Sequence, residues 1–334
     1  MSSHTKSLIG NPVPPFVARE VAKGDVSHFK GLGISFGSCD PMRYSVSHIT
    51  TLKYAAPVRL AQFNMRLRPA DWPGQTVSDY VLGIEPQPAQ VHDGEGGYHV
   101  NETRFSMHEP IDRLQVESRF TVEREPLPFF VADATGPDLA ELRERAMKLP
   151  DLSALAPASY IFASPVAAPE HDIAMWAGAF LDEAMPVMEA GRALMRAIHD
   201  EFTFDSKATF TDTPPIEAFR RRRGVCQDFS HVMIVAARAH GIPAGYVSGY
   251  LRTLPPPGRE RLVGADAMHA WVNLWCGEEL GWVGFDPTNA MLADADHIFI
   301  GMGRDYSDVA PLDGTFRGTS AQTMYFSVDV VPLE

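Results

Sequence analysis

After residue 40 the chain shows short runs in which apolar and polar residues alternate. Alternation with period two places one face of an extended strand against a core and the other face in solvent. The runs lie at 44–49, 104–107 and 114–122, and turn-forming residues at 93–97 separate the first two. We therefore expect an antiparallel β domain over residues 41–130. Its expected role is support of the rest of the protein, with substrate positioning as the lesser alternative.

The pattern then becomes helical. Apolar residues recur every three or four positions over 139–149, directly behind Asp138, a residue type that often begins a helix. A connector rich in Pro and Ala follows at 154–169. Further helical spacing predicts helices near 170–183 and 186–202, where the Met and aromatic residues suit a core better than a cofactor site.

The last part combines helices with short strands. Thr213, followed by two prolines, is typical of a helix start, and that helix should end before Gly224. A longer helix is expected over 226–240, followed by strands at 245–251, 268–276 and 281–285. A short turn at 277–280 should join the last two strands as a hairpin. Helices followed by antiparallel strands predict an α+β fold.

Three regions follow from these patterns. Residues 1–40 lack a clear period and form an expected N-terminal extension, loose or draped over a neighbouring surface. Residues 41–165 form the expected β-rich N-terminal domain with its connector. Residues 166–334 form the expected catalytic core and C-terminal strand.

Composition narrows the possible functions. The formal net charge of −13 argues against a nucleic-acid partner, because phosphate contacts require clustered Lys and Arg. The cysteines are Cys39, Cys226 and Cys276, an odd and small set that does not form a disulfide framework. A reducing cytosol keeps such residues as thiols.

No stretch reaches the roughly 18 to 20 unbroken apolar residues that a membrane span needs. The first residues are polar, and Pro12, Pro14 and Pro15 then interrupt the chain, which leaves no apolar core for a secretion signal. We expect a cytoplasmic protein without a membrane partner.

Cys226 is the first candidate for chemistry. Gly224 ends one predicted helix and Val225 leads into the next, so that Cys226 falls at a helix N-terminus. Unpaired backbone N–H groups and the positive end of the helix dipole favour a thiolate at such a position. The same N–H groups suit an oxyanion. A buried structural thiol explains the position of Cys226 equally well.

His269 and Asp286 favour the catalytic interpretation. His269 lies near the start of one strand of the predicted hairpin, and Asp286 closes the other strand. A hairpin places these strands side by side, so the carboxylate can orient the imidazole while the second ring nitrogen faces Cys226. A lone His on a strand is usually structural, but a paired His and Asp after a helix-capping Cys is much less often accidental.

Three blocks of sequence, 224–229, 266–271 and 281–289, resemble the signature motifs of the transglutaminase-like superfamily in its bacterial branch. The strand at 246–251 resembles the one that follows the nucleophile helix in that branch. The resemblance implies a papain-like α+β core, with a nucleophile helix packed on an antiparallel sheet. It also implies a catalytic triad with Cys226 as nucleophile, His269 as base and Asp286 as orienting group.

The resemblance extends beyond the core, from about residue 42 to the C-terminus. Residues 44–68 are similar to the β-rich N-terminal domain that accompanies the bacterial core, and 303–309 with Pro311 is similar to the segment after the triad Asp. Residues 1–40 extend beyond the usual start of the family. Met268 stands where related sequences often have Ser or Thr, which should alter the wall of the site but not its chemistry.

Several other residues have weaker claims. Gln227 and Asp228 are possible substrate or oxyanion contacts, although the helix dipole alone explains an acidic residue in a first turn. The run 220–223 is four arginines, which either attract an acidic substrate, favour the thiolate or form a solvated helix end. Asp305 and Tyr306 are possible lining residues.

No metal or cofactor is expected. The sequence has no His-Glu-x-x-His helix and no Cys-x-x-Cys pair. His231 and His240 share a predicted helix but lie on roughly opposite faces. Cys276 suits a small strand residue better than a second nucleophile.

The sequence therefore predicts cysteine-dependent cleavage of an amide or isopeptide bond in a peptide or protein substrate, through a thioester acyl-enzyme. A peptidase or amidase uses water as the acceptor. A transamidating acyltransferase of the protein-glutamine gamma-glutamyltransferase kind uses an amine, and both share the first half-reaction. A catalytically silent binding scaffold is the alternative from a different class.

Overall fold

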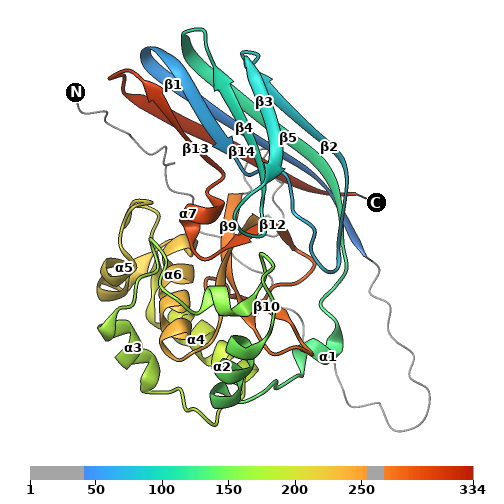
Figure 1. Cartoon of the computed structure of the whole chain (residues 1–334), viewed down its shortest axis with the longest axis vertical. Helices are drawn as coiled ribbons and strands as arrows, with labels where there is room; N and C mark the ends of the chain where they lie inside the picture. The colour runs from blue at the N-terminus through green and yellow to red at the C-terminus, as the bar shows by residue number, and fades with distance from the viewer. Residues whose placement is uncertain (1–40, 254–266, 334) are drawn as a thin grey trace, which may run out of the picture.

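The computed structural model describes residues 41–253 and 267–333. The expected N-terminal extension at 1–40, with Cys39, lies outside these residues, as does Asp266 of the second motif. The described chain forms a large curled antiparallel sheet and a smaller sheet with helices packed on it (Figure 1). This arrangement confirms the expected α+β class.

The large sheet is organised around one long strand, β1 (Met42–Met65). Its strands run in the order β2-β5-β1-β4-β3, and two strands from the end of the chain also pair with β1. The other strands are β2 (Gln75–Glu85), β3 (Gln90–Glu95), β4 (Asn101–Met107), β5 (Ile111–Arg124), β13 (Leu312–Arg317) and β14 (Gln322–Leu333). The predicted antiparallel β domain is therefore present.

The curl of this sheet follows from a change of partners along β1. Its first half pairs with β5 and β14, and its second half pairs with β4 and β13. The register with β5 shifts between Lys53 and Val58. Pro57 lies in this interval, and proline has no backbone N–H to donate to a ladder. The irregularity lets one strand serve two differently directed halves of the sheet.

The C-terminal strand, β14, pairs within the large sheet. The sequence had placed this strand in the same region as the core, because it follows the core along the chain. β14 runs antiparallel to β1, from Arg43↔Leu333 to Tyr54↔Gln322. Val328 of β14 is fully buried. A period-two pattern identifies a strand but not its partner, and here the partner comes from the opposite end of the described chain.

The core sheet has the order β11-β10-β9-β8-β12. These strands are β8 (Ala244–Leu251), β9 (Ala267–Trp275), β10 (Trp282–Asp286), β11 (Met291–Leu292) and β12 (His297–Gly303). The longer helices of this half are α2 (Leu139–Lys148), α3 (His171–Gly178), α4 (Val187–Glu201), α5 (Pro215–Arg221) and α6 (Cys226–Ala239). The short elements are α1 (Phe129–Ala132), a 3-10 turn (Pro157–Tyr160), β6 (Thr203–Phe204), β7 (Arg223–Gly224) and α7 (Tyr306–Val309).

α6 packs on the core sheet through an apolar face. Val232 and Met233 of α6 are fully buried in one cluster with Val272 and Leu274 of β9. The helix expected over 226–240 and the three strands expected after it are confirmed to within one residue at each end. The hydrophobic spacing was sufficient for these elements because they supply much of this core, and all eight residues of β8 are buried.

Two helix boundaries differ from the prediction. The helix expected to reach residue 183 ends at Gly178, where the Phe180 N–H turns back to Ala177 O at 3.1 Å. Thr213 does not cap α5, which begins at Pro215 behind Pro214. The Thr213 hydroxyl instead accepts the Phe210 N–H at 2.8 Å and closes a turn of the preceding loop.

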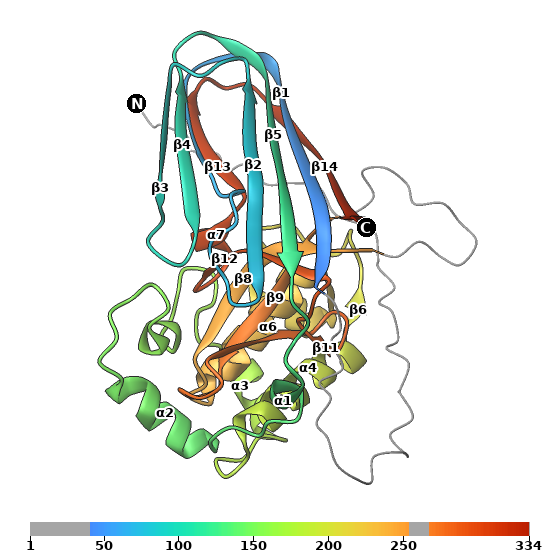
Figure 2. The ribbon, with the colours of Figure 1, turned by 90° about the vertical axis from the view of Figure 1, so that its right-hand side faces the viewer.

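The two sheets are joined by a buried apolar cluster. From the large sheet it includes Tyr44, Val46, Phe120, Val122, Val328 and Val330, and from the core sheet it includes Tyr250, Ile298 and Ile300. Gln75 of β2 adds two hydrogen bonds to the main chain of Phe299, one donated at 2.8 Å and one accepted at 2.9 Å. Figure 2 shows the lower ends of β1, β2 and β5 reaching the core. The large sheet is therefore fixed relative to the core.

Among the described residues, every helix is too short or too polar to cross a membrane.

We expect Gly249→Ala to destabilise the protein by about 1–3 kcal/mol, the usual cost of overpacking. Gly249 pairs with His269 on one side and Phe299 on the other. A Cβ there lies 2.3 Å from the Ile298 carbonyl oxygen and 2.4 Å from the Trp271 ring. Urea denaturation measures the change, and Gly97→Ala is the control because nothing lies within 4 Å of its added Cβ. Equal stability of the two variants contradicts the packing argument.

Candidate active site

The start of α6 presents the thiol as predicted. Cys226 is the first residue of the helix, and Val225 before it has extended backbone angles. The Asp228 carboxylate accepts the Val225 N–H at 2.8 Å and so fixes the entry of the chain into the helix. Gly224 makes room for this contact, since a Cβ there lies 2.5 Å from Asp228 Oδ2. Cys226 itself is half-buried.

The hairpin of β9 and β10 brings His269 and Asp286 together. His269 Nε2 lies 2.8 Å from Asp286 Oδ2. An ionised carboxylate only accepts, so we assign the proton of this bond to Nε2. Nδ1 is then the ring nitrogen that remains for the Cys226 thiol, which lines the same cavity as the His269 ring. The three residues proposed from sequence therefore meet at one place.

Two opposing effects act on His269, which is almost completely buried. Burial lowers the pKa of the imidazole, because desolvation penalises the charged ring. The charge of Asp286 and the hydrogen bonds with Asp286 and Cys226 act in the opposite direction and together raise the pKa above its ordinary value. The site thus favours an imidazolium next to the thiol.

Asp286 is fully buried, yet its carboxylate is satisfied by five hydrogen bonds. Oδ2 accepts from His269 and from the Asn289 side-chain nitrogen at 2.7 Å. Oδ1 accepts from the backbone N–H groups of Thr288 at 2.9 Å and Asn289 at 3.2 Å. Burial raises the pKa of Asp286, but the charge of His269 and the bonds from His269 and His297 outweigh it and hold the pKa well below its usual range.

His297 is a site residue that the sequence did not reveal. Its Nε2 lies 3.2 Å from Asp286 Oδ2, and both side chains are fully buried. The Asp294 N–H donates to His297 Nδ1 at 3.2 Å, so the ring proton is on Nε2 and is donated to Asp286. A lone His at the start of a strand gives no local signal. β12 is brought to the site by pairing with β8, which the sequence does not specify.

His269, Asp286 and His297 also form a group of three buried side chains whose ligand atoms lie within 4.8 Å of one another. Histidine ligands of a metal usually donate their second ring N–H to an acceptor. Nδ1 of His297 instead accepts a backbone N–H, which requires the proton on the nitrogen nearest to Asp286. The hydrogen bonding therefore fits a carboxylate held by two imidazoles better than a metal site.

Cys226 and His269 open on a cavity of about 710 Å³. Met268 is part of its wall, where the sequence placed it. Tyr306, which the sequence could not place, also lines the cavity. Asp305 instead lies buried at the start of α7, where its carboxylate accepts the Ser307 N–H at 2.9 Å.

The large sheet forms part of this cavity, which favours the substrate-positioning role that the sequence analysis gave as the lesser alternative. His48 and Thr50 of β1 and Met324 and Phe326 of β14 are lining residues. The alternating pattern at 44–49 did not indicate this role, because alternation shows that one face of a strand is buried but not whether that face lines a cavity or packs in a core.

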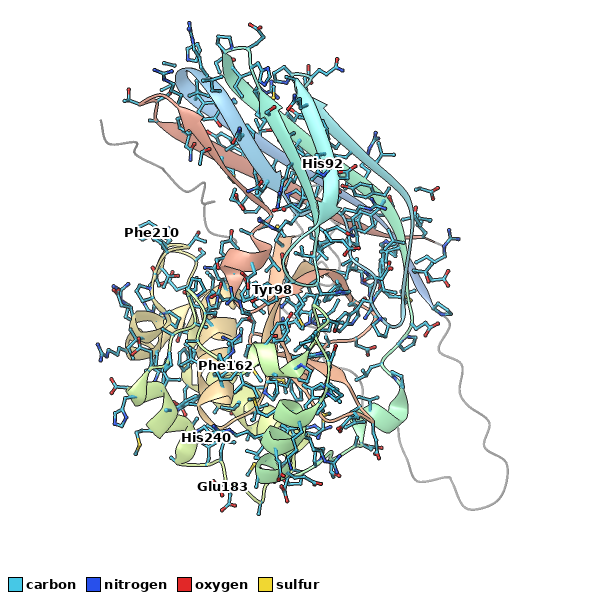
Figure 3. All side chains as sticks on the ribbon, viewed as in Figure 1. His92, Tyr98, Phe162, Glu183, Phe210 and His240 are labelled. Atoms are coloured by element: carbon cyan, nitrogen blue, oxygen red, sulfur yellow. The ribbon has the colours of Figure 1, made fainter. Side chains whose placement is uncertain are left out.

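Gln227, which lines the cavity, and the buried Asp228 both hold the loop at 205–213. The Gln227 side-chain nitrogen donates to Thr211 O at 2.9 Å, and the Thr209 hydroxyl donates to Asp228 Oδ2 at 2.7 Å. Phe210, with 79% of its surface exposed, stands on this loop at the edge of the core toward the large sheet (Figure 3). The residues after Cys226 therefore shape the side of the cavity that this loop forms.

The arginine run serves mainly structural contacts. Arg220, Arg221, Arg222 and Arg223 pair with Asp172, Glu217, Glu201 and Asp205, respectively.

Cys276 is fully buried, and burial raises the pKa of its thiol, as suits a structural residue. His231 is buried and its Nε2 accepts the Tyr306 N–H at 3.2 Å, while His240 Nε2 contacts Ala174 O at 3.1 Å.

Comparisons with known proteins agree with this geometry. Residues 174–287 match the family model described as the transglutaminase-like superfamily, and residues 44–123 match the bacterial transglutaminase-like N-terminal region. Uncharacterised proteins from Mycobacterium bovis and Mycobacterium tuberculosis are 36% identical over 297 residues, which is 87% of this chain and 93% of theirs. These relatives share nearly the whole architecture.

Two further similarities are more limited. A protein-glutamine gamma-glutamyltransferase from Pseudomonas aeruginosa is 35% identical over 108 residues, 31% of this chain and 16% of that protein. The crystal structure of a candidate cysteine protease from Cytophaga hutchinsonii superposes with a TM-score of 0.68 at 20% identity, covering 88% of this chain and 92% of that one. The second similarity shows a shared fold.

We expect Asp286 to make stability depend on pH. Its folded pKa is below the unfolded value of about 3.9. The unfolded chain therefore binds more protons in acid, and the stabilisation by Asp286 is present above that pH and lost as the pH falls. The difference in free energy of unfolding between wild type and Asp286→Asn should be largest above pH 5 and narrow below pH 4. Urea denaturation at each pH measures this free energy, and Asp112→Asn, at an exposed position, is the control. A difference between wild type and Asp286→Asn that does not change with pH contradicts the lowered pKa of Asp286.

Proposed function

The chain belongs to the bacterial transglutaminase-like proteins of the transglutaminase-like superfamily, and from this premise we propose that it is a cysteine-dependent peptidase or amidase. It cleaves an amide or isopeptide bond through a thioester acyl-enzyme. The observation that carries the proposal is that the Cys226 thiol and the His269 imidazole share one cavity, with Asp286 buried behind the imidazole.

Each residue has a role in the proposed first half-reaction. The Cys226 thiolate attacks the carbonyl carbon, and the C–S bond forms as the carbonyl π electrons move to oxygen. The first-turn N–H groups of α6, which have no partner within a helix, stabilise the oxyanion. The C–N bond then breaks, and the His269 imidazolium gives its proton to the leaving nitrogen. The product is a thioester on Cys226 and a free amine.

The second half-reaction uses the same groups in reverse. His269 takes a proton from the incoming nucleophile, whose oxygen or nitrogen attacks the thioester carbonyl, and the C–S bond breaks to restore the thiolate. Asp286 keeps the ring oriented throughout, because the donors around it hold it as an anion. Water as nucleophile gives a carboxylic acid, and a primary amine gives a new amide.

Transamidation is the second candidate. It is supported by the similarity over 108 residues to the protein-glutamine gamma-glutamyltransferase. Hydrolysis is preferred because it needs no second binding site, and the fold is shared with a candidate cysteine protease. Both candidates require the same activated thiol.

We expect iodoacetamide to label Cys226 rapidly at pH 6, well below the pKa of about 8.5 of a free thiol. The positive charge of the His269 imidazolium should assist attack by the Cys226 sulfur, so that His269→Ala lowers the labelling rate at pH 6 by at least about tenfold while having little effect at pH 9. Intact-protein mass spectrometry over time gives the rates.

Cys226→Ala identifies the labelled residue in this experiment, because this variant retains both other cysteines, Cys39 and the fully buried Cys276. His240→Ala is a matched histidine control, since its ring contacts only the opposite end of α6 and α3. Labelling at pH 6 that is as slow as that of glutathione and insensitive to His269→Ala refutes the activated thiol and leaves the scaffold alternative.

We expect water to be the preferred acceptor. Acylation of Cys226 by p-nitrophenyl acetate releases nitrophenolate and leaves an acetyl thioester, which the enzyme then turns over. With methylamine present at millimolar concentration, mass spectrometry should find acetate as the main product and N-methylacetamide in no excess over its yield from the ester without enzyme. An excess of N-methylacetamide that depends on Cys226 supports transamidation instead.

A further inference from the structure

We propose that the cavity at Cys226 accepts a substrate whose acyl side carries an uncharged, apolar side chain, and that Met324 and Phe326 of β14 form the subsite for it. This inference rests on the proposed function, because it assigns the acyl specificity of the same site. The large sheet then selects the substrate, and the core carries out the chemistry.

The composition of the cavity wall is the first observation. Apolar residues contribute much of its lining, and these include Phe204, Val225, Met268, Ala270, Leu312, Met324 and Phe326. Apart from the Cys226–His269 pair, Lys207 and Asp212 are the lining residues of the Lys, Arg, Asp or Glu type among those the structure describes. Both are exposed and lie on the loop at 205–213. A charged acyl side chain in the interior would lose its hydration without a counter-charge.

The alternation of β14 is the second observation. Met324, Phe326 and Val328 are two residues apart and share one face of the strand. Val328 is fully buried in the contact between the two sheets, whereas Met324 and Phe326 are only half-buried and line the cavity. The apolar row that joins the two sheets thus continues into the cavity wall, where Met324 also packs against the apolar cluster of the large sheet. Tyr325, on the other face, is 54% exposed.

A hydrogen-bonded chain behind this wall is the third observation. Thr50, the cross-strand partner of Phe326, contacts His48 Nε2 at 3.0 Å, and His48 Nδ1 contacts the Tyr250 hydroxyl at 2.8 Å. Burial lowers the pKa of His48 to about 4, so the ring is neutral at pH 7. The wall therefore offers the Thr50 hydroxyl, which His48 orients, next to an apolar surface. This combination suits the main chain of a peptide with an apolar side chain beside it.

Three p-nitrophenyl esters that differ only in the acyl group test the inference. They are the acetate, the 3-phenylpropanoate and the adipate monoester, which are small, apolar and anionic, respectively. Stopped-flow release of nitrophenolate gives the acylation rate constant for each, divided by its rate constant with N-acetylcysteine to remove intrinsic reactivity. We expect the phenylpropanoate to exceed the acetate by at least about tenfold, which corresponds to the burial of one or two methylene equivalents. The adipate should be the slowest.

Variants of β14 locate the preference. Phe326→Ser should reduce the phenylpropanoate-to-acetate ratio several-fold, and Phe326→Leu, which keeps an apolar side chain, should restore most of it. Tyr325→Ser, on the outward face of the same strand, should leave the ratio unchanged. Thermal unfolding verifies that each variant is folded, and the Leu variant keeps the test valid if the Ser variant is not.

The outcomes separate the two proposals. Cys226-dependent acylation at equal corrected rates for all three esters overturns the apolar subsite and leaves the proposed function intact. A preference for the phenylpropanoate that survives Phe326→Ser in folded protein overturns the assignment to β14. An absence of Cys226-dependent release with every ester overturns the proposed function, and the subsite with it.

Discussion

A buried carboxylate is the constraint on which this site depends. Asp286 is completely removed from water, and a charge in that position is stable only if the protein supplies hydrogen-bond donors in place of the solvent. The donors come from β9, from the turn after β10 and from the start of β12. Three strand ends are thus held at one point, and the orientation of His269 follows from that arrangement.

The second requirement is a wall opposite the nucleophile, and the large sheet meets it. The core by itself holds the thiol and the imidazole but gives only part of the cavity lining. The buried cluster between the sheets fixes β1 and β14 relative to β8 and β12, and other residues of β1 and β14 line the cavity that contains Cys226. The core thus holds Cys226 and His269, and the large sheet contributes lining residues to the same cavity because the buried cluster holds the two sheets together.

The sequence predicted those parts of the site that depend on short-range patterns. A Gly-Val-Cys segment before an amphipathic helix placed Cys226, and a hairpin with a short turn paired His269 with Asp286. His297 and His48 could not be predicted, because each arrives through strand pairing between distant segments and no local period distinguishes a buried His from any other. Gln227 and Asp228 were proposed as substrate or oxyanion contacts, and the partners of their side chains lie in a loop whose path the sequence did not specify. Likewise, a C-terminal strand was expected, but its pairing with β1 was not.

The pairing of β14 with β1 also has a consequence for biosynthesis. A ribosome produces β1 early and β14 last among the described strands, and contacts so distant in sequence form slowly. The helix with Cys226 and the hairpin with His269 are complete well before Phe326 is made. The nascent chain therefore contains Cys226 and His269 before it contains β14, and the cavity lining is complete only when this final strand docks. Formation of the proposed subsite thus depends on synthesis of the entire described chain.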